Sequence, residues 1–295
     1  MVCAVTGFAL QHLLAVQHDA GQVSFFQAVV YGIVQGLTEF LPISSTAHLR
    51  IVPALAGWDD PGAPFTAVIQ LGTTVAVVIY FWSELVNVTV GFLRGLVDRS
   101  LRPTLEFRMG SYLIVATMPV AALGVLFRDQ IETAARNMWL IASSLIVFAF
   151  TLLLAERIGT RHRREDDLDR TDAIAVGAAQ ALSLIPGASR SGTTITAGLF
   201  RGLDRPTAAR FSFLLSIPAV ALSGLFEARK IGDKGAAAAG PTLVALALAF
   251  LVGLASIAWL MRWISRHSTY LFIWYRVGLG LLLLGLLATN VVAAT

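Results

Sequence analysis

Long apolar segments dominate this sequence. Continuous apolar runs lie at 66–82, 111–127, 139–155, 242–261 and 277–294, and residues 207–226 form a further candidate. These runs approach or reach the length that crosses about 30 Å of hydrocarbon. Only 14% of the residues are charged, whereas a soluble domain carries about a quarter. The sequence therefore predicts an all-α integral membrane protein with several spans, in which residues 22–295 form a single membrane domain.

The remaining composition narrows the class further. The net charge is +4, but the basic residues are mostly arginines in the links between apolar runs, which is typical of membrane topology and excludes nucleic acid as a partner. Cys3 is the only cysteine, so an internal disulfide and a cysteine zinc site are excluded. Residues 1–21 lack a basic start and are interpreted as an N-terminal extension, with a cleaved signal as the alternative.

One apolar segment is interrupted by reactive side chains, at residues 36–49 with the sequence GLTEFLPISSTAHL. Pro42 removes a backbone donor and ends the first helix. Ser44 or Ser45 suits an N-cap, and a second short helix is predicted from Thr46 to about Gly57. Irregular backbone at membrane depth survives only where it lines protein or a wet cavity, so we expect a re-entrant hairpin.

The second half of the chain repeats this device in residues 173–203. A helix ends near Pro186, and another begins around Ser191 after a stretch rich in glycine and serine. The text GIVQGL at 32–37 matches GAAQAL at 177–182. We therefore predict a polytopic helical bundle of two repeats, about 22–157 and about 172–293, each with one re-entrant hairpin and about three spans.

Three spans between the two breaks make the hairpins enter from opposite sides, as in an inverted-topology repeat. The links at 98–108, 157–172 and 262–267 then share one side and carry most of the basic residues, which predicts that this side is cytoplasmic. The first hairpin would enter from the outer face, and we expect the site to open there.

The first break supplies a carboxylate, a hydroxyl and an imidazole. Gln35 and Glu39 are four residues apart, hence on one helical face, and together suit a hard divalent cation. Ser45 and His48 are three apart, which suits a nucleophile with its base or a base that orients water. The alternatives are a structural role for Glu39 and a packing role for His48.

The second break, PGASRSGTT, suits an anion. Gly192 permits close backbone approach, the N–H groups at a helix start bind anions, and Arg190 offers a planar fork that matches phosphate oxygens. Alternatively, Arg190 only neutralises Glu39. Arg276 lies near the start of its span, so we expect it to extend to the membrane interface. Together, the breaks predict a site for a lipid with a phosphate or diphosphate head, and for phosphoryl transfer.

At these two motifs the sequence resembles the undecaprenyl-diphosphate phosphatase family, also called the bacitracin-resistance family. QGLTEFLPISSTAHL is similar to its first signature and PGASRSGTT to its second, and the resemblance covers about residues 22–293. It implies an enzyme of the bacterial plasma membrane that hydrolyses undecaprenyl diphosphate, and other polyprenyl diphosphates, for cell-wall synthesis with Mg²⁺ or Ca²⁺. Oligomeric state is left open, with a homodimer as one alternative.

The resemblance also assigns roles to residues. A divalent cation would be held by Glu39 and Gln35, and the catalytic group would comprise Glu39, Ser45, His48 and Arg190. The phosphate-binding group would comprise Ser44, Thr46, Ser189, Arg190, Ser191, Gly192 and Thr194.

The sequence departs from the family pattern in two places, and several alternatives stay open. Gln35 is the weaker ligand of the permitted Glu-or-Gln pair, which puts binding of a metal by two carboxylates in doubt, and Ala47 stands where glycine is common. Ser45 attacking with His48 as its base is the working hypothesis, and attack by water or by His48 is the alternative. A polyprenyl-phosphate transporter built on the same broken helices is the rival function. The type 2 phosphatidic acid phosphatases are a second rival. They need a second histidine after a Ser-Arg motif, and the only histidine after Arg190 in this sequence, His267, is in a predicted loop.

Overall fold

The computed structural model describes residues 23–134, 137–231 and 239–294. In these ranges the chain is helical, and the one extended pairing there is an isolated bridge between Arg163 and Leu203. The expected N-terminal extension, residues 1–21, lies outside the described residues. The predicted all-α class is confirmed.

Within the described part, 4 helices are long and apolar enough to cross a membrane. These are α6 (Leu105–Leu126), α8 (Met138–Ile158), α12 (Ala239–Ile264) and α13 (Tyr270–Ala288). A further crossing forms if α4 (Gly62–Tyr80) and α5 (Trp82–Val97), which meet at a 76° bend, act together. α11 (Arg205–Ile231) covers the expected segment 207–226 and has the length of a span, but its sequence is less apolar. The chain is thus a multi-span membrane protein.

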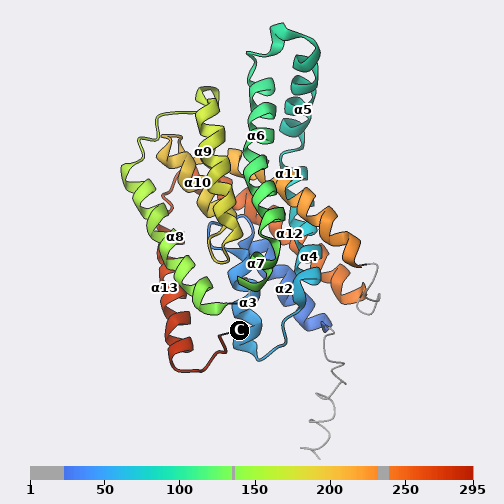
Figure 1. Ribbon diagram of the computed structural model, residues 1–295, viewed down its shortest axis with the longest axis vertical. Helices are drawn as coiled ribbons and strands as arrows, with labels where there is room; N and C mark the ends of the chain where they lie inside the picture. The colour runs from blue at the N-terminus through green and yellow to red at the C-terminus, as the bar shows by residue number, and fades with distance from the viewer. Residues whose placement is uncertain (1–22, 135–136, 232–238, 295) are drawn as a thin grey trace, which may run out of the picture.

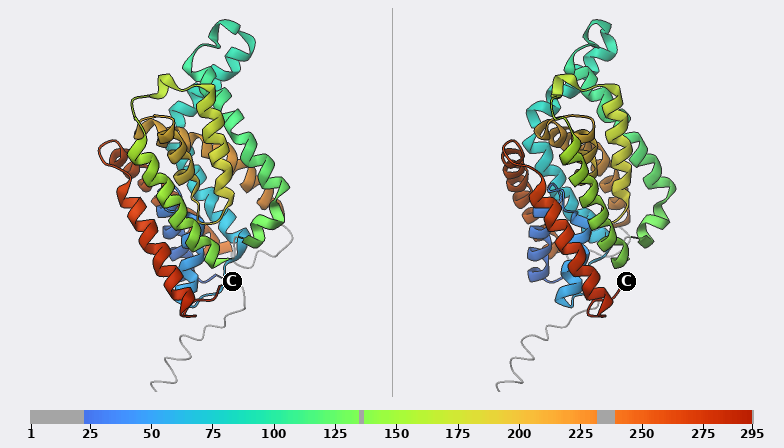
Figure 2. Two further views of the ribbon diagram at one scale, coloured as in Figure 1. Left: turned by 60° about the vertical axis from the view of Figure 1, so that its left-hand side comes forward. Right: turned by 90° about the vertical axis from the view of Figure 1, so that its left-hand side faces the viewer.

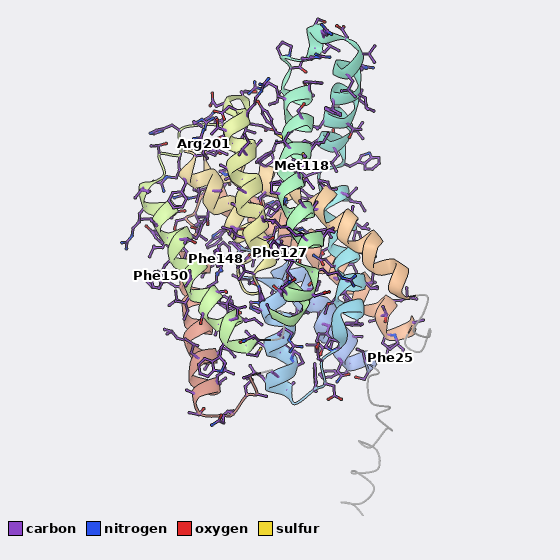
Figure 3. The ribbon with its side chains drawn as sticks, viewed as in Figure 1. Phe25, Met118, Phe127, Phe148, Phe150 and Arg201 are labelled. Atoms are coloured by element: carbon purple, nitrogen blue, oxygen red, sulfur yellow. The ribbon has the colours of Figure 1, made fainter. Side chains whose placement is uncertain are left out.

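Large apolar side chains lie on the outside of the bundle as well as in its core. Phe25 and Met118, labelled in Figure 3, are 61% and 63% exposed, and Phe150 on α8 is 47% exposed. Extensive exposed apolar surface is unfavourable in water. In a bilayer the same side chains face hydrocarbon, which agrees with several helices long enough to span it.

Four short helices form the two expected hairpins. The first hairpin is α2 (Phe25–Thr38) with α3 (Ser45–Ala56), and the second is α9 (Arg170–Ala181) with α10 (Arg190–Phe200). None of them reaches the roughly 20 residues that a spanning helix needs. Figure 1 shows α2 and α3 in the half of the molecule that holds the C-terminus, and α9 and α10 in the other half. This placement agrees with entry from opposite sides, while the inverted repeat itself stays a prediction.

Each hairpin packs against a span from the other half of the sequence. α2 lies on α12, where Gly32 faces Ala245, and α9 lies on α6, where Gly177 faces Ala116. A Cβ added at Gly32 would lie 2.5 Å from the Ala245 carbonyl oxygen, so the helix backbones approach closely. α8 and α13 run side by side along one edge of the bundle (Figure 2). The halves are therefore interlocked.

Two buried carboxylates tie the links around α9 and α10. Asp172 accepts hydrogen bonds from Arg163 (2.6 Å to Oδ2) and from Arg201 (2.7 Å to Oδ1). Glu156 at the end of α8 pairs with Arg205, and its other oxygen accepts a hydrogen bond from Thr269 at 2.8 Å. These contacts hold the start of α9 and the end of α10 together. The remaining short elements are α7 (Arg128–Ala134) and the 3-10 turns η1 (Arg99–Leu101), η2 (Glu165–Asp167) and η3 (Leu182–Leu184).

Gly177→Ala is expected to lower the midpoint of thermal unfolding in detergent by several degrees. A Cβ at this position would lie 2.6 Å from the Ala116 Cα, and overpacking of this kind costs about 1–3 kcal/mol. Gly278→Ala on α13 is the matched control, because no atom lies within 4 Å of its added Cβ and alanine favours a helix over glycine. Equal midpoints for the two variants would contradict the close packing of α9 on α6.

Candidate active site

The first break begins where α2 ends. Ser24 caps α2 together with Gln27, and the helix stops at Thr38, ahead of the turn at residues 39–43 that contains Pro42. Ser44 then adopts φ 74°, and its hydroxyl accepts the Ala47 N–H at 3.4 Å to begin α3. The sequence therefore predicted the N-cap, and α3 begins at Ser45, one residue before the expected Thr46.

The second break has the same local design. After α9 and the η3 turn, Gly187 has φ 88°, and Ser189 has φ 71° with its hydroxyl accepting the Gly192 N–H at 3.1 Å. Ser44 and Ser189 are the equivalent caps about 145 residues apart, as the matching text at 32–37 and 177–182 predicts. A residue other than glycine at positive φ is uncommon and is often found at functional sites. Both breaks thus carry the same strained cap.

Glu39 is the centre of the site. One carboxylate oxygen accepts hydrogen bonds from Arg190 at 2.6 Å and from Gln70 at 3.3 Å. The other accepts from Ser45 at 2.7 Å and from Gln35 at 2.9 Å. The pair is shielded, with 6% of the Glu39 side chain and 16% of the Arg190 side chain exposed. The structure therefore brings together four residues predicted from the two breaks.

The first residues of the two inner helices bond to this same carboxylate. Ser45 begins α3 and Arg190 begins α10, so the first side chain of each helix reaches Glu39. Helix N-termini carry partial positive charge and N–H groups without a partner in the helix. Ser191 links the breaks further, since its hydroxyl donates to the Leu41 carbonyl at 3.1 Å. The arrangement suits an anion.

Space at the ion pair is very limited. A narrow hollow beside Glu39 and Arg190 is lined by Phe40, Thr74 and Val77 on one side and by Ser216 of α11 on the other. It leaves no room for a phosphate group. Arg190 pairs with Glu39 here, as the alternative interpretation of the sequence expected.

His48 and Ser45 have different hydrogen-bond partners. Its Nδ1 is 2.8 Å from the Ser44 carbonyl oxygen, and its Nε2 is 2.7 Å from the Tyr275 hydroxyl. The Ser45 hydroxyl instead donates to Glu39. The shared helical face was predicted, but the geometry pairs Ser45 with a carboxylate and pairs the imidazole with α13.

Several of the expected phosphate-binding residues bond locally. The Ser44 and Thr46 hydroxyls are 3.1 Å apart, and those of Ser189 and Ser191 are 3.2 Å apart. Thr194 donates to the Arg190 carbonyl at 2.7 Å and its hydroxyl lies 2.6 Å from that of Ser212 on α11. Thr194 thus joins α10 to α11.

Arg276 corrects one expectation. It does not extend to the interface, because it is 0% exposed and its guanidinium donates to carbonyl oxygens of both breaks. Its Nη2 lies 3.0 Å from Gly187 O and 2.9 Å from Ala188 O, and its Nη1 lies 3.3 Å from Pro42 O. Backbone carbonyls left free by a broken helix need buried donors, and Arg276 supplies them.

The same arginine leaves no space for a side chain at Gly192. A Cβ added there would lie 2.7 Å from the Arg276 Nη1. The sequence had assigned this glycine to close approach of a phosphate, whereas in this structure it gives room to a guanidinium from α13. A bound phosphate can still contact the same turn of α10, so that role stays a prediction.

Sequence reasoning missed three contributors, Gln70, Thr73 and Tyr275. Gln70 and Thr73 of α4 flank the ion pair, since Gln70 bonds to Glu39 and Thr73 accepts from Gln35 at 3.4 Å. Their polar side chains within the apolar run 66–82 were an available signal. Tyr275 gave no such signal, because only the fold brings α13 to the breaks.

Fold and site together define a class: a multi-span membrane protein whose two broken hairpins meet at a shielded carboxylate and guanidinium beside two helix N-termini. A family model described as Bacitracin resistance protein BacA matches residues 28–282. The chain belongs to this family.

Similar proteins in three bacteria are each named undecaprenyl-diphosphatase. The one from Mycobacterium ulcerans (strain Agy99) is 49% identical over 277 residues, which is 92% of this chain and 100% of the relative. The one from Corynebacterium diphtheriae is 50% identical over 281 residues, 94% of this chain and 99% of the relative. The one from Chlorobium phaeobacteroides (strain BS1) is 50% identical over 285 residues, which is 92% of this chain and 100% of the relative.

Arg276→Lys is expected to destabilise the protein strongly, although it keeps the charge. A lysine lacks the fork that reaches three carbonyls of the breaks, and each buried carbonyl left without a donor costs about 1–3 kcal/mol. Thermal unfolding in detergent measures the loss. Arg266→Lys, at an exposed position in the link before α13, is the control. If Arg276→Lys unfolded with the wild-type midpoint, the role as a clamp would be wrong.

Proposed function

We propose that this chain hydrolyses undecaprenyl diphosphate to undecaprenyl phosphate and inorganic phosphate, which returns the carrier lipid to cell-wall synthesis. The observation that carries the proposal is the contact of Arg190 with Glu39 between two helix N-termini, in a chain about 50% identical to proteins named for this activity. Cationic groups and helix N-termini in a shielded place stabilise the charge that develops on phosphoryl oxygens.

Binding of a diphosphate requires Arg190 and Glu39 to separate. Arg190 is occupied by Glu39, and the hollow beside the pair is too narrow for a phosphate. In the proposed reaction the diphosphate takes over Arg190 and the N–H groups at the start of α10, while Glu39 is released from its ion pair. The hydroxyls of Ser189 and Ser191 lie at the same turn and can donate to phosphate oxygens.

Ser45 is the proposed nucleophile. Its hydroxyl already donates to Glu39 at 2.7 Å, so Glu39 is better placed than His48 to take its proton. The Ser45 oxygen bonds to the terminal phosphorus as the anhydride P–O bond breaks and undecaprenyl phosphate leaves. Water then hydrolyses the phosphoserine, which releases inorganic phosphate and restores Ser45. Attack by water, or by His48, remains the alternative mechanism.

A divalent cation, Mg²⁺ or Ca²⁺, fits as a companion of the substrate. Among the described residues no group of three or more His, Cys, Asp or Glu side chains has the geometry of a metal site. Glu39 and the adjacent Gln35 amide nevertheless suit Mg²⁺, which is commonly held by one or two carboxylates together with substrate phosphates. When bound, the cation would neutralise charge on the diphosphate oxygens.

We place the chain in the bacterial plasma membrane with its site opening to the outer face. The support is that α2 and α3 lie in the half of the molecule opposite the arginine-rich links at 98–108 and 157–172 (Figure 1). Other polyprenyl diphosphates share the same head group and are proposed as further substrates. A homodimer is proposed as one alternative, in which part of the exposed apolar surface would face a second copy of the chain.

Phosphate release from undecaprenyl diphosphate by the purified protein in detergent tests the function. Glu39→Gln is expected to lower kcat by about 100-fold or more, and Arg190→Lys by about 10- to 100-fold, because lysine keeps the charge but loses the planar fork. Arg266→Lys, exposed and distant in sequence from both breaks, should leave activity unchanged.

Two outcomes would contradict parts of this proposal. Wild-type protein that binds the lipid without releasing phosphate would favour the transporter. A burst of phosphorylated enzyme that persists in Ser45→Ala would exclude Ser45 as the nucleophile.

Gln35→Glu tests the placement of the cation. A second carboxylate beside Glu39 should lower the half-saturating Mg²⁺ concentration several-fold, because carboxylates bind Mg²⁺ more strongly than amides do. The same variant should unfold at a lower temperature when Mg²⁺ is chelated, since two adjacent carboxylates repel each other. An unchanged Mg²⁺ dependence in a folded variant would show that Gln35 does not face the metal.

A further inference from the structure

The imidazole of His48 is held on both of its nitrogens. Nδ1 contacts the Ser44 carbonyl at 2.8 Å, within the same turn of α3. Nε2 contacts the Tyr275 hydroxyl at 2.7 Å, from α13 at the other end of the chain. The two rings are also almost parallel, with an angle of 6° and centroids 5.6 Å apart. The ring therefore has a defined orientation.

The two partners also define where the protons are. A backbone carbonyl can only accept a hydrogen bond, so Nδ1 of His48 carries the proton. In the neutral ring Nε2 is then a lone pair, and the Tyr275 hydroxyl is its donor. The pair of contacts selects one tautomer of one residue, and the partner on the second nitrogen is supplied by α13.

His48 and Tyr275 differ in how much of each is exposed. His48 is 8% exposed, whereas Tyr275 is 45% exposed. The neighbouring Arg276 directs its guanidinium to the carbonyls of Pro42, Gly187 and Ala188, and within the described part of the chain Tyr275 is the partner of Nε2. The lone pair of His48 is therefore directed at a phenol of α13, and Ser45 keeps Glu39 as its acceptor.

We propose that Tyr275 is a positioning residue for His48. Its hydroxyl donates to Nε2 and keeps that nitrogen facing α13, in the Nδ1-protonated tautomer that the Ser44 carbonyl requires. The expected effect of Tyr275 on turnover rests on the proposed phosphatase activity, whereas its contact with His48 does not. This contact gives the last helix a part in the site that the two sequence motifs do not contain. Because Arg276 fixes the adjacent residue to both breaks, Tyr275 is held in register with the first residues of α3.

Tyr275→Phe tests this, since it removes the hydroxyl and keeps the stacked ring. The first readout is ¹⁵N NMR of histidine-labelled protein in detergent, with the His48 signals assigned by loss in His48→Gln. Wild-type His48 should show a protonated Nδ1 and a hydrogen-bonded lone pair at Nε2, and Tyr275→Phe should move the Nε2 signal. The second readout is hydrolysis of undecaprenyl diphosphate, where kcat should fall about 3- to 10-fold with KM little changed, as for loss of one hydrogen bond.

Tyr270→Phe is the matched control, because Tyr270 lies on the same helix and its hydroxyl has no hydrogen-bond partner in the described part of the chain. It should change neither readout. The proposal is overturned if Tyr275→Phe leaves the His48 signals at their wild-type positions, whether or not kcat falls. It is also overturned if wild-type His48 carries its proton on Nε2. Wild-type protein without hydrolytic activity would refute the proposed function alone, because the NMR comparison needs no substrate.

Discussion

A helix that stops inside a membrane leaves carbonyl groups that neither water nor lipid can satisfy, and this constraint shapes the site. Here one guanidinium, that of Arg276, donates to carbonyls of both breaks. The two broken hairpins come from sequence segments about 145 residues apart, and a third segment joins them. The cost of interrupting two helices inside the bundle is thus offset by a residue that lies in neither motif.

Charge at the site follows from this arrangement. Among the residues that the structure describes, Glu39 is the one carboxylate at the meeting point of the breaks. Arg190 and Arg276 both lie there with the N-termini of α3 and α10. Glu39 neutralises the Arg190 guanidinium, whereas Arg276 is bonded to backbone carbonyls and has no carboxylate partner among the described residues. Such a place favours an anion, which agrees with a substrate whose head group is a diphosphate.

The sequence predicted the local features of the site and missed the long-range ones. Pro42 and the serine caps act within a few residues, so the position of each break could be read directly. The contact of Glu39 with Arg190 was foreseen as one alternative, because ionised groups at membrane depth need partners. The predicted role of Arg276 was wrong, because the position of a residue near the end of a span does not reveal which carbonyls the fold places beside it. Helical spacing put Ser45 and His48 on one face, but it could not show that Glu39 and Tyr275 would take their hydrogen bonds.

The matching caps at Ser44 and Ser189 have a consequence for how a ligand would lie. Both breaks present the same backbone geometry, yet the first residue after the cap is a serine in one and an arginine in the other. A molecule placed between them meets a hydroxyl at one end and a guanidinium at the other. The site therefore has polarity, and a diphosphate with its long tail on one side would have a single favoured direction of entry.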